Sequence, residues 1–143
     1  MNRIELADSE WELWEKPDIQ FKPRNMPPIC GIMPSGLYLN RTAMEIIGRD
    51  KNAVVFYLSK DKTKIGMWFF KDKSIVSQVR GLNAGVAYSV VKHPRNGTAR
   101  ISCAKFVEDN KLRERTLQLG KVSFPIIPDR EEKQPDFYVV ELK

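Results

Sequence analysis

Histidine and cysteine are scarce in this chain, which has one histidine, His93, and two cysteines, Cys30 and Cys103, among 143 residues. A structural zinc site takes four ligands, usually in closely spaced pairs, and these scattered residues do not supply them. A Cys–His nucleophile could draw on His93, but no further motif supports one. Both cysteines lie among apolar neighbours outside any disulfide framework, so we interpret them as buried free thiols.

Long apolar runs and catalytic motifs are also missing. No stretch approaches the roughly 18 apolar residues of a membrane-spanning helix, and residues 1–5 do not resemble a signal peptide, so we expect a cytoplasmic protein with no membrane partner. Residues 81–85 hold two glycines, but no Lys-Ser/Thr follows, which predicts a loop. The acidic pairs 108–109 and 131–132 are interpreted as solvent-exposed surface residues and not as catalytic carboxylates. The sequence therefore predicts a non-enzymatic protein without metal or cofactor.

Charge is unevenly distributed along the chain. Residues 1–21 carry a net charge of −4, residues 22–121 carry +12, and residues 122–143 carry −2. A basic body between acidic ends indicates a polyanionic partner. The alternative interpretation is an ordinary solvated surface of mixed sign.

Residues 29–70 organise the chain. Two short apolar runs, 29–33 and 37–39, are separated by a Pro-Ser-Gly turn and predict a β-hairpin. Asn40 is a favoured helix N-cap, and apolar residues at helical spacing lead from it to Gly48, where a C-cap is expected. Because this helix has only about two turns, the surrounding strands must hold it in place.

A second hairpin completes this unit. Residues 53–58 and 64–70 are rich in β-branched and aromatic side chains, and the polar segment 59–63 separates them. The unit therefore runs strand, strand, helix, strand, strand.

This arrangement resembles the swapped-hairpin (AbrB/MazE-type) fold, and it also resembles a set of small phage and prokaryotic proteins with a Leu-Asn-capped helix before such a hairpin. The resemblance covers about a third of the chain and implies DNA binding. The family typically carries arginine before the second strand and an arginine pair in the helix. Those positions hold Gly36, Met44 and Glu45 here, so the family's DNA contacts do not carry over.

A second passage of the chain echoes the first. Residues 86–91 and 98–101 flank an Asn-Gly turn and predict another hairpin, and Ser102 is placed to cap a helix over 103–107. One strand before Gly120 and two more at 122–127 and 138–140 are then expected. We therefore predict an α+β, β-rich domain in which one β-hairpin/short helix/β-hairpin unit is duplicated about a pseudo-two-fold axis as a swapped-hairpin-like barrel.

The expected domain plan has two parts. Residues 1–28 form an acidic, aromatic arm with a Pro-rich linker, and residues 29–143 form a single β-rich domain with half-units 29–80 and 86–143. The arm either packs over the core, docks on a partner chain or covers the basic body. An additional strand is predicted around residues 75–79.

Two kinds of macromolecular partner fit this composition, DNA and protein. The predicted nucleic-acid contacts are basic residues around the first helix, at the tip of the 53–70 hairpin and in the 86–101 hairpin: Arg41, Arg49, Lys51, Lys60, Lys62, Lys64, Lys92, Arg95 and Arg100. The alternative is a protein-interaction module of inhibitor, adaptor or assembly type that uses exposed aromatic side chains: Trp11, Trp14, Trp68 and Phe70. Under either hypothesis, we expect the protein to be a monomer with pseudo-two-fold symmetry or a homodimer.

Overall fold

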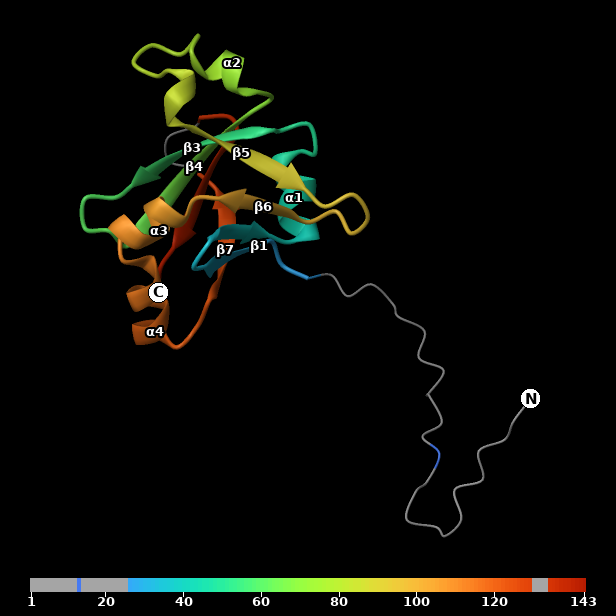
Figure 1. Ribbon diagram of the computed structural model, residues 1–143, viewed down its shortest axis with the longest axis vertical. Coiled ribbons are helices and arrows are strands. Elements are labelled where there is room, and N and C mark those ends of the chain that lie inside the picture. Colours follow the sequence, from blue (N-terminus) through green and yellow to red (C-terminus); the bar gives the residue numbers. More distant parts are fainter. Residues whose placement is uncertain (1–12, 14–25, 130–133) are drawn as a thin grey trace.

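The computed structural model describes residues 13, 26–129 and 134–143. Within this part, eight antiparallel strands close into a barrel, with four short α-helices and one 3₁₀ turn around it (Figure 1). The strands are β1 (Ile29–Met33), β2 (Gly36–Leu39), β3 (Ala53–Leu58), β4 (Lys64–Phe70), β5 (Ala87–Lys92), β6 (Ala99–Ser102), β7 (Ser123–Pro128) and β8 (Phe137–Glu141). The helices are α1 (Arg41–Ile47), α2 (Lys73–Val76), α3 (Ala104–Asp109) and α4 (Leu112–Leu119), with the 3₁₀ turn at Ala84–Val86.

The strand order gives the barrel its symmetry. Around the barrel the strands run β1-β2-β6-β5-β3-β4-β8-β7, and β7 pairs again with β1. If β1, β2, β3 and β4 are exchanged with β5, β6, β7 and β8, respectively, the same closed order results, read around the barrel in the opposite direction. The hairpin β3–β4 lies between β5 and β8, while β7–β8 lies between β1 and β4, so each half inserts its second hairpin between strands of the other. The predicted α+β, β-rich, barrel-like fold is thus confirmed.

Alternation of side chains along the strands fills the barrel. Leu37 and Leu39 of β2 are fully buried, whereas Tyr38 between them faces outward. Strands β6, β7 and β8 show the same period of two, which places Ile101, Phe124 and Val140 inside. An eight-stranded barrel has an interior that side chains can fill, and here they form one continuous core.

Helix α1 closes one end of the barrel. Its N-cap is Asn40, as predicted, and Asn40 Oδ1 accepts from the amides of Ala43 at 2.9 Å and Ile29 at 3.0 Å. The buried residues Ala43, Met44 and Ile47 turn one face into the core. The Tyr138 hydroxyl on β8 donates to the Ile46 carbonyl at 2.8 Å, and this hydrogen bond holds the C-terminal end of α1 against the barrel.

The chain between the two halves covers the outer face of β3, β4 and β5. A second cluster there joins Val55, Phe70 and Val76, with Trp68 packed against it. The strand predicted around residues 75–79 is wrong, because Asp72 Oδ1 accepts from the amides of Ser74 and Ile75 and starts α2 instead.

The second half departs from the sequence prediction in two further places. Ser102 is the last residue of β6, and Cys103 stands at the helix N-cap without a side-chain cap hydrogen bond. The strand predicted before Gly120 is helix α4, which ends where Gly120 adopts a left-handed conformation with φ 66°.

Candidate nucleic-acid interface

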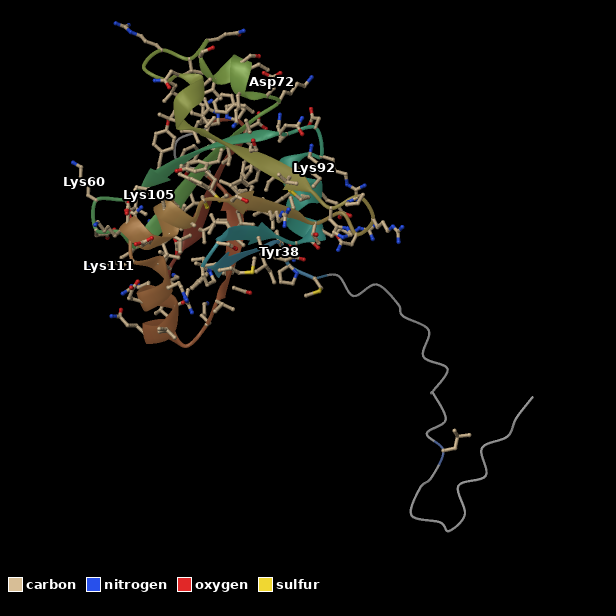
Figure 2. The ribbon with its side chains drawn as sticks, viewed as in Figure 1. Tyr38, Lys60, Asp72, Lys92, Lys105 and Lys111 are labelled. Atoms are coloured by element: carbon tan, nitrogen blue, oxygen red, sulfur yellow. The ribbon has the colours of Figure 1, made fainter. Side chains whose placement is uncertain are left out.

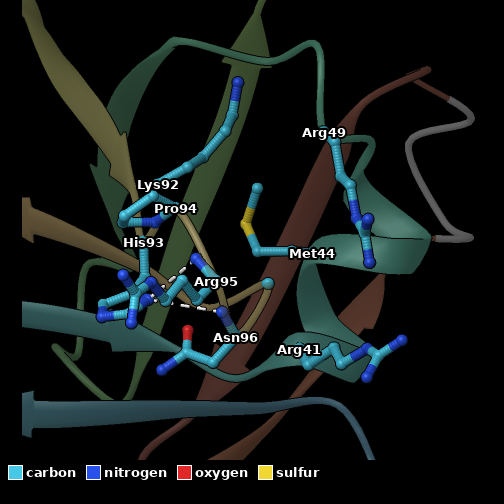
Figure 3. Close-up of a pocket in the computed structure, with 9 residues that line it drawn as sticks. Arg41, Met44, Arg49, Lys92, His93, Pro94, Arg95 and Asn96 are labelled. Atoms are coloured by element: carbon cyan, nitrogen blue, oxygen red, sulfur yellow. Dashed lines mark hydrogen bonds between the residues drawn. The ribbon is translucent and has the colours of Figure 1, made fainter.

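Four of the nine predicted basic residues converge at the α1 end of the barrel. Arg41 and Arg49 come from α1 and the residues just after it, and Lys92 and Arg95 come from the end of β5 and the loop that follows (Figure 3). They surround a pocket of about 310 Å³ together with Met44, His93, Pro94, Asn96 and Gly97. Segments about fifty residues apart in sequence therefore build one cationic concavity.

The loop between β5 and β6 has a defined shape. His93 Nδ1 accepts from the amides of Arg95 at 3.2 Å and Asn96 at 3.3 Å, so the ring's other nitrogen carries the proton when the imidazole is neutral. Asn96 Oδ1 accepts from the Thr98 amide at 3.0 Å. These contacts hold Arg95 at the rim of the pocket.

Gly97 brings this loop close to α1. It adopts φ +74°, and a Cβ at this position would lie 3.1 Å from Arg41 Cγ and 3.3 Å from Arg49 Nη2. The backbone therefore packs directly against both arginine side chains. This contact is the reason that α1 and the loop form one surface.

The pocket has a surplus of positive charge. Glu45 Oε1 lies 3.2 Å from Arg41 Nε and 3.8 Å from Arg49 Nη2, so one carboxylate is shared by two guanidinium groups. Lys92 Nζ donates to Asn52 Oδ1, a neutral group, at 2.7 Å. Arg95 has no ion-pair partner within the described residues. Such an arrangement can bind a phosphate group through several donors.

A second pocket adjoins the first. It has a volume of about 420 Å³, is mainly apolar, and is lined by Met26, Ile29, Gly31, Tyr38, Asn40, Arg41, Thr42, Thr98 and Ser123. Arg41 lines both pockets, so they meet at this side chain. Tyr38 is 38% exposed, and its ring lies over Gly31 of the neighbouring strand.

Arg100 faces outward beside this second pocket. It pairs with Tyr38 across the β2–β6 ladder and with Val91 across the β5–β6 ladder. Its side chain thus extends the basic surface along the outside of the barrel.

The other predicted lysine contacts, Lys51, Lys60, Lys62 and Lys64, do not line the first pocket. Lys60 and Lys92 are on opposite sides of the barrel (Figure 2). Lys60 and Lys62 belong to the β3–β4 turn rather than to a strand, and Lys62 has φ 59°, so their side chains do not continue the alternation of β4 that begins at Lys64. Lys51 Nζ lies 3.4 Å from Asp136 Oδ2, and its side chain is only 16% exposed, which indicates a structural role.

The β3–β4 turn also contains a carboxylate. Hydrogen bonds from the Thr63 and Ser59 hydroxyls lower the pKa of Asp61 to about 2. Asp61 therefore stays ionised at neutral pH and offsets part of the lysine charge.

Two of the four predicted interface aromatics lie within the described residues. Phe70 is buried in the second core cluster and Trp68 is half-buried beside it, with the two rings 4.9 Å apart. The prediction that Phe70 is exposed is wrong, because α2 covers it. Trp11 and Trp14 lie outside the described residues.

Both cysteines are buried free thiols, as predicted. Burial, with a smaller effect of Cys103, raises the pKa of Cys30 from 9.0 to about 12, and burial raises that of Cys103 to about 11. Such thiols are protonated at neutral pH and are poor nucleophiles.

We expect the stability of the protein to fall as the pH rises from about 9 to 12, because the folded chain retains the two thiol protons that the unfolded chain releases. Each raised pKa contributes stability that is fully present below pH 9 and is lost as the pH rises through the folded value. Urea unfolding at a series of alkaline pH values measures the decline. The Cys30→Ala variant should be less stable at neutral pH but should lose stability less steeply with pH. An equal slope in both proteins would contradict the assignment to Cys30.

Tyr38, His93 and Gly97 also line this surface, although they are not among the residues predicted from the sequence. The alternation of Leu37, Tyr38 and Leu39 already indicates an outward tyrosine between two core residues. No signal in the sequence places Gly97 against α1, since that contact depends on pairing between distant strands.

Neither the search of the described residues for membrane-spanning helices and metal sites nor the comparisons with known proteins gave a match. No helix of the described residues is long and apolar enough to cross a membrane, and these residues contain no His, Cys, Asp or Glu group suited to a metal ion. No protein-family model matches the chain, and no curated protein or solved structure matches it either.

Proposed function

We propose that this protein binds nucleic acid through the basic pocket between α1 and the β5–β6 loop. The observation that carries the proposal is that Arg41, Arg49, Lys92 and Arg95 line one concavity, while Arg41 and Arg49 share the carboxylate of Glu45. Guanidinium groups suit phosphate because their planar donors match its oxygens. The net charge of +6 adds long-range attraction to a polyanion.

The chemistry is binding rather than catalysis. The arginines would contact successive phosphates of the backbone, which fixes the position of the strand without reading its sequence. With four contacts, the logarithm of the binding constant should fall with the logarithm of salt concentration at a slope of about −3 for single strands.

A charge-reversal pair tests the proposal. We expect Arg49→Glu/Arg95→Glu to weaken binding of labelled oligonucleotides by roughly tenfold or more at low salt and to flatten the salt slope by about one to two contacts. Fluorescence anisotropy over a salt series measures both quantities. Arg49 and Arg95 are exposed, so the fold should tolerate the changes.

The matched control is Lys60→Glu/Lys62→Glu, which changes the charge by the same amount at the opposite side of the barrel. This variant should retain most of the binding and the slope. Equal losses in both variants would indicate a response to net charge alone and would contradict a localised site.

Protein binding is the second candidate function, and it is favoured by the barrel face opposite Tyr38. Ile127, Val139, Gly66 and Tyr57 are in register across β7, β8, β4 and β3, and Ile127 and Tyr57 are 49% and 39% exposed. A second copy of the chain is the first occupant to test. Light scattering over a range of concentrations would then show a mass that rises toward that of a dimer, and Ile127→Ser should abolish the rise.

A further inference from the structure

We propose that the two adjoining pockets bind one nucleotide unit together, with its phosphate in the basic pocket and its base against Tyr38, so that the protein selects single-stranded nucleic acid. This inference rests on the proposed nucleic-acid binding and adds the class of nucleic acid. The basis is the sharing of Arg41 by a cationic pocket and a mainly apolar one. A nucleotide has the same two parts, an anionic phosphate and a flat apolar base joined through one sugar.

The apolar pocket has the parts that a base needs. Tyr38 presents a partly exposed ring, and Met26 and Ile29 supply apolar walls. Gly31 and Ser123, in register with Tyr38 across β1 and β7, are small and leave the ring accessible. Stacking on an aromatic ring is tolerant of base identity, because every base has a π-face.

The polar groups at the junction fix the orientation of the nucleotide. Asn40 Oδ1 already accepts from two backbone amides, and its Nδ2 donates to the Pro27 carbonyl at 2.8 Å, so this end of the pocket is rigid. Arg41 follows directly and lines both pockets, and its Nε donates to Glu45 Oε1 at 3.2 Å. The phosphate therefore belongs on the Arg41 side and the base on the Tyr38 side.

Arg100 indicates where the strand continues. It lies beside Tyr38 on the outer face of β6, in direct register, so a neighbouring phosphate can reach it while the base remains on the ring. A duplex cannot use this surface in the same way, because its bases are already paired and stacked on one another. Single-stranded binding sites elsewhere combine a basic track with aromatic platforms for the same reason.

Three probes that all carry a phosphate backbone separate the contribution of the phosphates to binding from that of an unpaired base. They are a labelled oligothymidylate, an abasic oligomer of equal length, and a duplex of equal length. The wild-type chain should bind oligothymidylate most tightly at moderate salt. Tyr38→Ala should weaken oligothymidylate binding by roughly 5- to 100-fold and leave abasic binding unchanged, whereas Tyr38→Phe should retain it. Tyr57→Ala is the matched control, since Tyr57 is equally exposed on the opposite face.

A second variant tests the pocket without removing the ring. A Cβ at Gly31 would make ordinary contacts of 3.6 Å with Tyr38 and 3.9 Å with Ser123 Oγ, so Gly31→Ala should fold normally and fill part of the floor. It should weaken oligothymidylate binding and leave abasic binding intact.

The outcomes distinguish the two proposals. Equal affinity for all three probes, or no effect of Tyr38→Ala where Arg49→Glu/Arg95→Glu removes binding, would overturn the base pocket and leave the phosphate site standing. Preference for the duplex would likewise overturn selection of single strands. Failure of the wild-type chain to bind any probe would overturn both proposals.

Discussion

Replacing Gly36 with alanine is expected to cost roughly 4 kcal/mol or more of folding free energy, at the high end for a single substitution. Gly36 is the first residue of β2, and it pairs with Ser102 of β6, where a strand of the first half of the barrel adjoins a strand of the second. A Cβ there would lie 1.9 Å from the Ile101 carbonyl oxygen and 2.9 Å from the Cys103 amide nitrogen. These are backbone atoms of β6 and of the residue that follows it, so no side-chain rotation relieves the overlap, and the φ of +154° disfavours any other residue.

Gly31→Ala is the matched control in the adjacent strand. Its added methyl group meets only ordinary van der Waals contacts, so we expect a change within about 0.5 kcal/mol. Urea unfolding followed by circular dichroism gives both values, with an unchanged m-value in the control. A Gly36→Ala variant as stable as Gly31→Ala would show that β2 and β6 can separate at low cost and would contradict the register described above.

The first half of the chain could be predicted from sequence because its signals are local. The strands Ile29–Met33, Ala53–Leu58 and Lys64–Phe70 have the predicted bounds, and α1 begins after Asn40 as its capping pattern indicates. In each of these segments residue type, spacing and turn chemistry agree, which is the condition under which short-range patterns specify structure.

The second half was less predictable because its signals are weak or conflict. Helix α4 buries only Leu112 and Thr116, while Leu117 is 75% exposed, so its apolar residues do not follow a helical face. A similar conflict occurs in α2, between the two halves, where the adjacent Ile75 and Val76 resemble a strand but capping by Asp72 starts a helix. Capping outweighs the β-branched pair there because the segment is only four residues long.

The basic surface shows the same limit on a larger scale. Lys60, Lys62 and Lys64 are close in sequence, but they lie in and beside the β3–β4 turn, next to an ionised Asp61 and away from the basic pocket. The pocket joins Arg41 to Arg95 because β2 pairs with β6, a contact between the two halves that no local pattern encodes. The basic residues and the β-rich fold class are therefore predictable from the sequence, whereas the strand pairing that brings Arg41 and Arg95 together is not.

The interleaved strands lead to the largest expected effect, a complete loss of folding when the two halves are separated. Fragments 1–80 and 81–143 each lack half of the barrel. In the first, β1 loses β7, β2 loses β6, β3 loses β5 and β4 loses β8, so both hairpins are left without outer partners. An isolated hairpin is marginally stable in water, and the core side chains of either fragment would be exposed.

Neither fragment alone should show a cooperative unfolding transition as a monomer, whereas an equimolar mixture should regain strand content and the transition of the intact chain. Circular dichroism and thermal unfolding of each fragment and of the mixture measure this, with light scattering to report mass. A fragment that folds cooperatively as a monomer would contradict the exchange of hairpins between halves. Because the pocket takes Arg41 and Arg49 from one fragment and Lys92 and Arg95 from the other, oligonucleotide binding should return only with the mixture. Recovery of folding and binding together would tie the basic pocket to the pairing of the two halves, since neither fragment holds more than two of its four cations.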